Sequence, residues 1–190
     1  AGAWLGTRRK DPSRATPDWT GALARVAVGA TFLLLVAGGL VTGNKAGLAV
    51  VDWPNSYGYN MFLYPFARMT GGIYYEHAHR LLGALVGLTT ATLAVRLAQI
   101  ETRIWVKRMG LTAVALVVVQ GILGGLRVTE KSIGLAVVHG VTAQVFLSLL
   151  VAIAVVCAKT WRSDLPALPR RRAGADRRIA SIAVAALVLQ

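Results

Sequence analysis

Long apolar runs alternate with short polar segments along the chain. Four of these runs lie at about 23–41, 73–97, 109–126 and 133–158. Each approaches the roughly 20 residues that an α-helix needs to cross the hydrocarbon core of a bilayer. A fifth apolar run begins at Ile179 and is still continuing at Gln190. The pattern predicts an all-α integral membrane protein, in which a bundle of four transmembrane helices is followed by the start of a fifth at 179–190.

Polar segments separate the predicted spans. Residues 1–22 hold two prolines and no apolar period, which indicates a basic N-terminal tail. Residues 43–72 form a long, Gly- and Pro-containing loop, and all five tyrosines lie between Trp53 and Tyr75. Because amphipathic rings favour the headgroup layer, we expect this loop on the outer surface. Residues 159–178 are basic and predict a cytoplasmic linker.

The composition and charge fit this membrane interpretation. The chain is 55% hydrophobic and only 15% charged, whereas an average soluble domain is about 25% charged. Most of the 21 lysines and arginines lie in three segments, 8–14, 96–108 and 159–178. The positive-inside rule produces such an alternation and places the N-terminus in the cytoplasm. The net charge of +13 therefore reflects the orientation of the spans in the membrane lipid, and we expect no nucleic-acid partner.

Other features limit the chemistry. Cys157 is the only cysteine, so a disulfide within the chain and a cysteine metal cluster are both excluded. We expect Cys157 to be a buried, small apolar side chain. No Gly-rich phosphate loop or Ser nucleophile motif supports a kinase or hydrolase. Because the chain lacks an initiating Met and ends inside an apolar run, we interpret it as a piece of a longer protein.

Ionisable residues gather in the first third of the second span, in the sequence Glu76-His77-Ala78-His79-Arg80. Inserting such residues into a bilayer costs several kcal/mol, and they usually face the bundle interior. At 100° per residue, Glu76, His79 and Arg80 share one helix face while His77 points away from His79. The simplest interpretation is an ion-paired cluster that anchors the helix at the membrane surface.

A third histidine, His139, matches His79 in depth. Each lies about six residues into a span that runs from outside to inside, so both imidazoles sit roughly 9 Å below the outer boundary. Two histidines at one depth on two helices of a bundle form the geometry of a haem ligand pair, and imidazole suits iron. Gly140 leaves room for a flat macrocycle. A hydrogen-bonding role in the core is the alternative for each histidine taken singly.

Other residues within the spans are less specific. Gly121, Gly124 and Gly125 are typical of close helix packing. Gln120 and Gln144 are amides that we expect to bond neighbouring helices. Arg127, at the outer end of the third span, either holds a haem propionate or extends its charge to the membrane surface.

Six short motifs occur in order between residues 23 and 158. They are Gly38-Gly39-Leu40-Val41-Thr42-Gly43, Gly47-Leu48, Asp52-Trp53-Pro54, Glu76-His77-Ala78-His79-Arg80, Leu123-Gly124-Gly125-Leu126-Arg127-Val128 and His139-Gly140. Each is weak alone, and the ordered set is specific. With this set the chain resembles the N-terminal half of haem A synthase, the membrane oxidoreductase that matures haem for cytochrome oxidase.

The resemblance implies two pseudo-symmetric four-helix repeats that oxidise a methyl group of haem O to the formyl group of haem A. In the N-terminal repeat, His79 and His139 would be the axial iron ligands of the substrate haem, and Glu76 the catalytic carboxylate. Arg80 would support that site or a propionate. A haem B cofactor would lie in the C-terminal repeat beyond Gln190, without which this chain can be inactive. Haem O synthase and an electron donor are the implied partners, and a homo-oligomer is left open.

The outer loop departs from the family pattern. Some members carry a cysteine pair there, and residues 43–72 contain none. Asn44-Lys45-Ala46 and Val50-Val51 stand where a Ser-rich, Pro-containing stretch is expected. The absence of a Ser- and Arg-rich transit peptide favours the bacterial inner membrane over the mitochondrial inner membrane.

Two other functions remain open on the sequence. A bis-histidine b-type cytochrome that only carries electrons would use the same ligand pair and give Glu76 no chemical role. A small transporter or assembly scaffold would use the Glu76–Arg80 cluster as a polar site and bind no haem.

Overall fold

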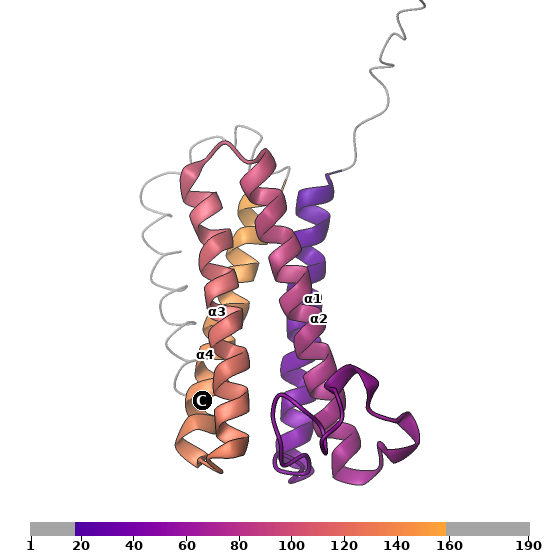
Figure 1. The fold of residues 1–190 in the computed structure, drawn as a ribbon. Helices are drawn as coiled ribbons and strands as arrows, with labels where there is room; N and C mark the ends of the chain where they lie inside the picture. Colours follow the sequence, from indigo (N-terminus) through magenta and orange to yellow (C-terminus); the bar gives the residue numbers. More distant parts are fainter. Residues whose placement is uncertain (1–17, 159–190) are drawn as a thin grey trace, which may run out of the picture.

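Four long helices form the described part of the chain, which in this computed structural model covers residues 18–158 (Figure 1). They are α1 (Trp19–Gly43), α2 (Gly71–Ile100), α3 (Ile104–Thr129) and α4 (Ile133–Cys157). Each is long and apolar enough to cross a membrane. The predicted all-α membrane architecture of four helices is therefore confirmed. The tail as far as residue 17, the linker at 159–178 and the fifth span at 179–190 lie outside the described residues.

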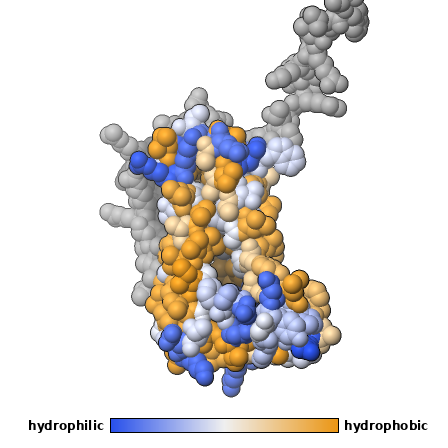
Figure 2. Space-filling model, viewed as in Figure 1, coloured by the Kyte–Doolittle hydropathy of each residue, from blue (hydrophilic) through white to orange (hydrophobic). Residues whose placement is uncertain are grey.

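The surface of the bundle fits a bilayer. Figure 2 shows apolar side chains along the flank of the helices and hydrophilic residues gathered at the two ends. Large apolar residues such as Leu88 and Leu111 are exposed on the outside of α2 and α3. The protein does not bury these apolar side chains. Their exposure on the outside of the bundle is explained by contact with lipid.

Short connections make the neighbouring helices antiparallel. Residues 101–103 join α2 to α3, and residues 130–132 join α3 to α4. Asp18 caps α1 by accepting a hydrogen bond from the N–H of Gly21, and Ser132 caps α4 in the same way through Leu135. Contacts run from α1 to α2, from α2 to α3, from α3 to α4 and back from α4 to α1. The helices therefore form a ring in which α2 and α4 lie diagonally opposite.

Between α1 and α2, residues 44–70 form a folded segment that we call the cap loop. It contains two short 3₁₀ helices, η1 (Met61–Leu63) and η2 (Phe66–Arg68). Figure 1 places the cap loop at one end of the bundle, beside the start of α2. We call this end of the bundle the cap end.

The half of the bundle away from the cap loop is solidly packed. Its buried apolar core takes residues from the first half of α1 and α3 and the second half of α2 and α4: Ala24, Ala27, Val86, Leu93, Leu97, Val106, Ala113, Phe146, Leu150, Ile153, Val156 and Cys157. Cys157 is fully buried, as predicted. Close packing of this half fixes the four helices relative to one another.

Glycine brings two helices together at Gly110 of α3. A Cβ atom placed there would lie 3.0 Å from Cδ1 of Leu97 and 3.4 Å from the backbone Cα of Ala94, both in α2. The sequence predicts a packing role for Gly121, Gly124 and Gly125. Gly124 admits the ring of His139 from α4 and Gly125 admits Trp53 of the cap loop, whereas nothing lies within 4 Å of a Cβ atom placed on Gly121. They face side chains or open space near the cap end.

An ion pair between Glu101 and Arg103, which we call the Glu101–Arg103 clasp, lies at the end of the bundle away from the cap loop. The carboxylate of Glu101 accepts hydrogen bonds from Nε and Nη2 of Arg103, at 3.0 and 2.8 Å, and from the backbone N–H of Thr102. Arg103 also donates to the carbonyl of Val156 near the end of α4. Hydrogen bonds from the Arg103 side chain lower the pKa of Glu101 from 4.5 to about 2, against the opposing effect of burial.

We predict that Glu101→Gln lowers the free energy of unfolding at pH 7 by about 1–3 kcal/mol, since charge-assisted hydrogen bonds are lost. Because the folded-state pKa lies below the ordinary one, the stabilisation is full above pH 4.5 and disappears as the pH falls toward 2. Thermal unfolding in detergent at pH 7 and pH 3 measures this difference. Glu130→Gln, in the exposed α3–α4 connection, is the matched control. A gap between wild type and variant that is unchanged at pH 3 would contradict the prediction.

Candidate functional site

A cavity of about 580 Å³ occupies the half of the bundle nearest the cap loop. All four helices and the cap loop line it, and its volume is in the range of small-molecule and cofactor sites. Figure 2 shows a hollow at this level, on the face between α2 and α3. The bundle is thus packed at one end and hollow at the other.

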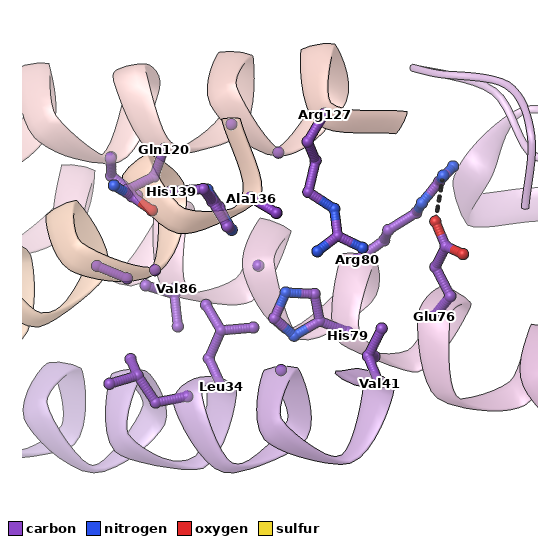
Figure 3. A pocket seen from close by; sticks show the side chains of 18 of the residues that line it. Leu34, Val41, Glu76, His79, Arg80, Val86, Gln120, Arg127, Ala136 and His139 are labelled. Atoms are coloured by element: carbon purple, nitrogen blue, oxygen red, sulfur yellow. Dashed lines mark hydrogen bonds and ion pairs between the residues drawn. The ribbon is translucent and has the colours of Figure 1, made fainter. Parts of the chain in front are cut away.

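His79 and His139 both line the cavity. They come from α2 and α4, the diagonally opposite helices, and Figure 3 shows both side chains in the same space. His77 does not line it, as its helix position predicts: it is buried on the other side, where its Nδ1 lies 3.1 Å from Oγ of Ser56. The arrangement separates two cavity-facing imidazoles from one that anchors the loop.

Each cavity histidine faces a glycine of the neighbouring helix. A Cβ atom on Gly38 of α1 would lie 3.1 Å from Cε1 of His79, and one on Gly124 of α3 would lie 3.3 Å from Cε1 of His139. Both glycines begin the same Gly-Gly-Leu sequence. The two helical hairpins, α1–α2 and α3–α4, therefore have equivalent histidine positions. In each, a histidine of the second helix faces the first glycine of a Gly-Gly-Leu sequence in the first helix.

Glu76 and Arg80 form a buried ion pair at the edge of the cavity. Oε1 of Glu76 accepts from Nη2 of Arg80 at 2.9 Å, and Oε2 accepts from the N–H of Val50 at 3.0 Å. The predicted i, i+4 pair is confirmed. The pair lies in the part of the cavity nearest the cap loop (Figure 3), where it presents a fixed negative charge beside a fixed positive one.

Arg80 also holds the cap loop. Its Nη1 donates to the carbonyls of Asp52 and Asn55, and its Nη2 donates to that of Val50, at distances of 2.7–2.9 Å. With Glu76, these acceptors use all four N–H groups of the two terminal nitrogens. Of the two roles implied for Arg80, its contacts support the one in which it braces Glu76 and the loop.

Arg127 reaches into the cavity from the end of α3 (Figure 3). Its Nη2 donates to the carbonyl of Gly47 at 2.7 Å, which ties α3 to the cap loop. This bond uses one of the five N–H donors of the guanidinium. Arg127 is therefore better placed than Arg80 to bind a carboxylate of a ligand in the cavity.

The cap loop is folded around Asp52. Its carboxylate accepts from the N–H groups of Tyr57 and Gly58, which both have positive φ and form the turn between Ser56 and Tyr59. Burial would raise the pKa of Asp52, but these backbone hydrogen bonds and the charge of Arg80 outweigh it, so the pKa lies below the ordinary value. The turn presents the buried Ser56 to His77.

Trp53 closes the cavity from the cap loop. The space beside Gly125 of α3 is filled by the indole ring of Trp53, so that even a Cβ atom would collide with it. Trp53 and Pro54, which are joined by a cis peptide bond, both line the cavity. The lack of a side chain at Gly125 thus allows the Trp53 ring of the cap loop to cover the cavity.

The structure brings together all five residues that the sequence assigns to a site: Glu76, His79, Arg80, Arg127 and His139. Sequence reasoning missed Gly38 and Gly124 as neighbours of the histidines, and it missed Trp53 as the roof. The repeated Gly-Gly-Leu sequence, at the same end of α1 and α3, is the signal that points to the glycines.

The ligand set in residues 18–158 limits the kind of metal that fits. No group of three or more His, Cys, Asp or Glu side chains gathers there to hold a bare metal ion. A metal that brings its own equatorial ligands, as the iron of a porphyrin does, needs only two imidazoles from the protein.

Comparison with known proteins gives no relative. No protein-family model matches the chain, and neither the curated proteins nor the solved structures include a match.

We predict that Gly38→Ala and Gly124→Ala displace the imidazoles of His79 and His139, because the added methyl group meets each ring at close range. Overpacking of this kind destabilises a protein by about 1–3 kcal/mol. Ring chemical shifts of the histidines and thermal unfolding measure the effect. Gly39→Ala and Gly121→Ala, where nothing lies within 4 Å of the new methyl, are the matched controls. Equal effects in both pairs would contradict the prediction.

Proposed function

We propose that the cavity binds a haem between His79 and His139, and that the chain is the N-terminal, haem O-oxidising repeat of a haem A synthase. The observation that carries the proposal is the placement of two imidazoles, from diagonally opposite helices, in one cavity of about 580 Å³. The family resemblance of the ordered motifs supplies the reaction. A methyl group of haem O would be oxidised to the formyl group of haem A.

The residues present fit a haem. Nδ1 of His79 is buried without a hydrogen-bond partner in the described part of the chain, which leaves this nitrogen available to a ligand. Apolar side chains such as Leu34 and Val86 line the inner part of the cavity, and Gly140 leaves open space on α4. When bound, the haem supplies the redox chemistry of its iron.

Arg127 is the residue for a haem propionate in this proposal. It extends into the cavity at the cap end, and a guanidinium binds a carboxylate through paired N–H donors. The polar groups lie at the cap end and the apolar walls lie deeper in the bundle. An amphipathic macrocycle would therefore bind with its carboxylates toward the cap loop.

Glu76 is the candidate catalytic carboxylate. Arg80 and the N–H of Val50 bind its two oxygens, so both are held in place. A carboxylate held in this way stabilises positive charge that develops on a neighbouring group during oxidation. Its immobility also aims that charge at one side of the cavity.

The remaining elements of the proposal follow from the family. The chain would act in a bacterial inner membrane with its N-terminus in the cytoplasm and the cap loop outside. A haem O synthase would supply the substrate, and a separate donor would supply electrons. A C-terminal repeat would hold haem B.

A b-type cytochrome is the second candidate, and the contacts of Glu76 favour it. Both carboxylate oxygens are already used in holding Arg80 and the cap loop, which is a sufficient structural role. A cytochrome would carry electrons through the same ligand pair and leave its haem unchanged by turnover.

We predict that the purified protein supplied with haem gives a low-spin spectrum, and that His79→Ala and His139→Ala each abolish it or convert it to high spin. Each variant removes one of the two imidazoles that would hold the iron. Oxidised and reduced absorption spectra measure this. His77→Ala, which removes a histidine outside the cavity, is the control and stays low-spin. A wild type that remains colourless would refute both haem functions.

We predict that Glu76→Gln keeps haem bound and lowers conversion of haem O by about 100-fold, in line with the loss of a catalytic carboxylate. Gln retains an acceptor for the N–H of Val50 but removes the charge. Product analysis of haem extracts measures conversion. Ser56→Ala, which loosens the cap loop through His77 without changing the charge of the cavity, is the control. Equal losses in both variants would assign Glu76 a structural role, and unchanged haem in the wild type would favour the cytochrome.

A further inference from the structure

Gln120 is a buried amide of α3 that lies directly beside His139 of α4. One end of its side-chain amide is bonded to Oγ1 of Thr142, also in α4. The other end lies 3.1 Å from Nδ1 of His139 and 3.2 Å from the backbone carbonyl oxygen of the same residue. The side chain lines the cavity (Figure 3). No other side-chain amide described for the bundle has a ligand candidate as a hydrogen-bond neighbour.

The amide has two orientations, which differ in whether its oxygen or its nitrogen faces Nδ1 of His139. With its nitrogen toward Thr142, its oxygen faces Nδ1 of His139 and accepts a hydrogen bond only if that nitrogen carries a proton. With its nitrogen toward His139, it donates to Nδ1 and to the His139 carbonyl, while its oxygen accepts from Thr142 and from the N–H of Ala143 at 3.2 Å. The second orientation removes the contacts between like groups that the first makes with the N–H of Ala143 and the carbonyl of His139. It requires the Thr142 hydroxyl proton to turn from the carbonyl of Val138 to the amide oxygen.

Each orientation fixes one tautomer of the imidazole. A neutral histidine carries its proton on one ring nitrogen and a lone pair on the other. If Nδ1 accepts from Gln120, the proton is on Nε2, which then has no lone pair for a metal. If Nδ1 donates to Gln120, Nε2 is free to bind iron. A metal-bound histidine normally donates its second N–H in this way.

His79 lacks such a partner. Its Nδ1 is among the buried polar atoms without a hydrogen bond in residues 18–158. The two histidines face equivalent glycines but differ in this one respect. The His79 ring has the backbone of Leu34 as its hydrogen-bond neighbour, so no side-chain amide controls its tautomer.

We propose that Gln120 is a positioning residue that sets the tautomer of His139, and that its amide turns by half a rotation when iron binds at Nε2. The proton moves from Nε2 to Nδ1, so the imidazole stays neutral and no proton leaves the site. In the ligand-free bundle Gln120 donates to Nδ1, and in the loaded bundle it accepts from it. The loading step rests on the proposed haem function, whereas the tautomer of the ligand-free protein does not.

The first arm of the test uses the full chain without haem. Nitrogen-15 NMR of histidine-labelled protein in detergent distinguishes the two tautomers, and His139→Ala identifies the signals of that ring among the three histidines. Wild type is expected to show His139 protonated on Nε2. Gln120→Leu is expected to give a mixture of both tautomers. Gln144→Leu, the other amide that lines the cavity, is the matched control and is expected to match wild type.

The second arm adds haem to the same proteins. Gln120→Leu is expected to bind haem about 10–100-fold more weakly than wild type, the usual effect of losing such an outer partner. Its spectrum is expected to contain a high-spin fraction. Gln144→Leu is expected to keep the low-spin spectrum. Gln120→Met, which preserves the shape of the side chain, is measured in parallel in case the Leu variant does not fold.

The outcomes separate the two proposals. An unchanged nitrogen-15 pattern in folded Gln120→Leu or Gln120→Met overturns the positioning role, whatever the haem result. A changed pattern in a chain whose wild type binds no haem supports tautomer control and overturns the haem function together with the loading step. A changed pattern with the haem affinity and spectrum of Gln144→Leu overturns the loading step alone.

Discussion

A buried arginine sets the architecture of the cap end. Arg80 lies inside an apolar bundle, where an unsatisfied charge would be costly. Its terminal nitrogens reach Glu76 and the carbonyls of Val50, Asp52 and Asn55. Because the three carbonyls lie on the cap loop, satisfying the charge requires the loop to fold back over the helices. The cap loop therefore covers the cavity because its carbonyls accept the hydrogen bonds of Arg80.

The two halves of the bundle have different structural roles. Apolar packing in the half away from the cap loop holds the ring of helices together, and the Glu101–Arg103 clasp closes that end. The half beside the cap loop is not packed in this way and contains the cavity. A hollow in a bundle loses dispersion contacts unless something fills it. The cost is tolerable because the packed half and the cap loop fix the walls, and a ligand in the cavity would restore those contacts.

Within the cavity, two similar hairpins produce two dissimilar histidine positions. Gly38 and Gly124 admit the two rings in the same way. Of the two histidines, only His139 has Gln120 as a hydrogen-bond neighbour, and Arg127 binds the cap loop beside the cavity. Glu76 adds a negative charge on one side. A symmetric frame with asymmetric polar groups gives a flat ligand one preferred orientation, as the proposed oxidation of one methyl group would require.

Local pattern by itself determined the four helices, the Glu76–Arg80 pair and the shared face of Glu76 and His79, because these depend only on hydropathy and on the pitch of a helix. Tertiary structure alone decided what the polar groups bind. Arg80 meets the Asp52 carbonyl 28 positions away, and Arg127 meets Gly47 80 positions away. The contacts of the glycines depend on tertiary structure for the same reason. Helix packing and a cavity use identical residues, and only the arrangement of all four helices shows which side chain or space a glycine faces.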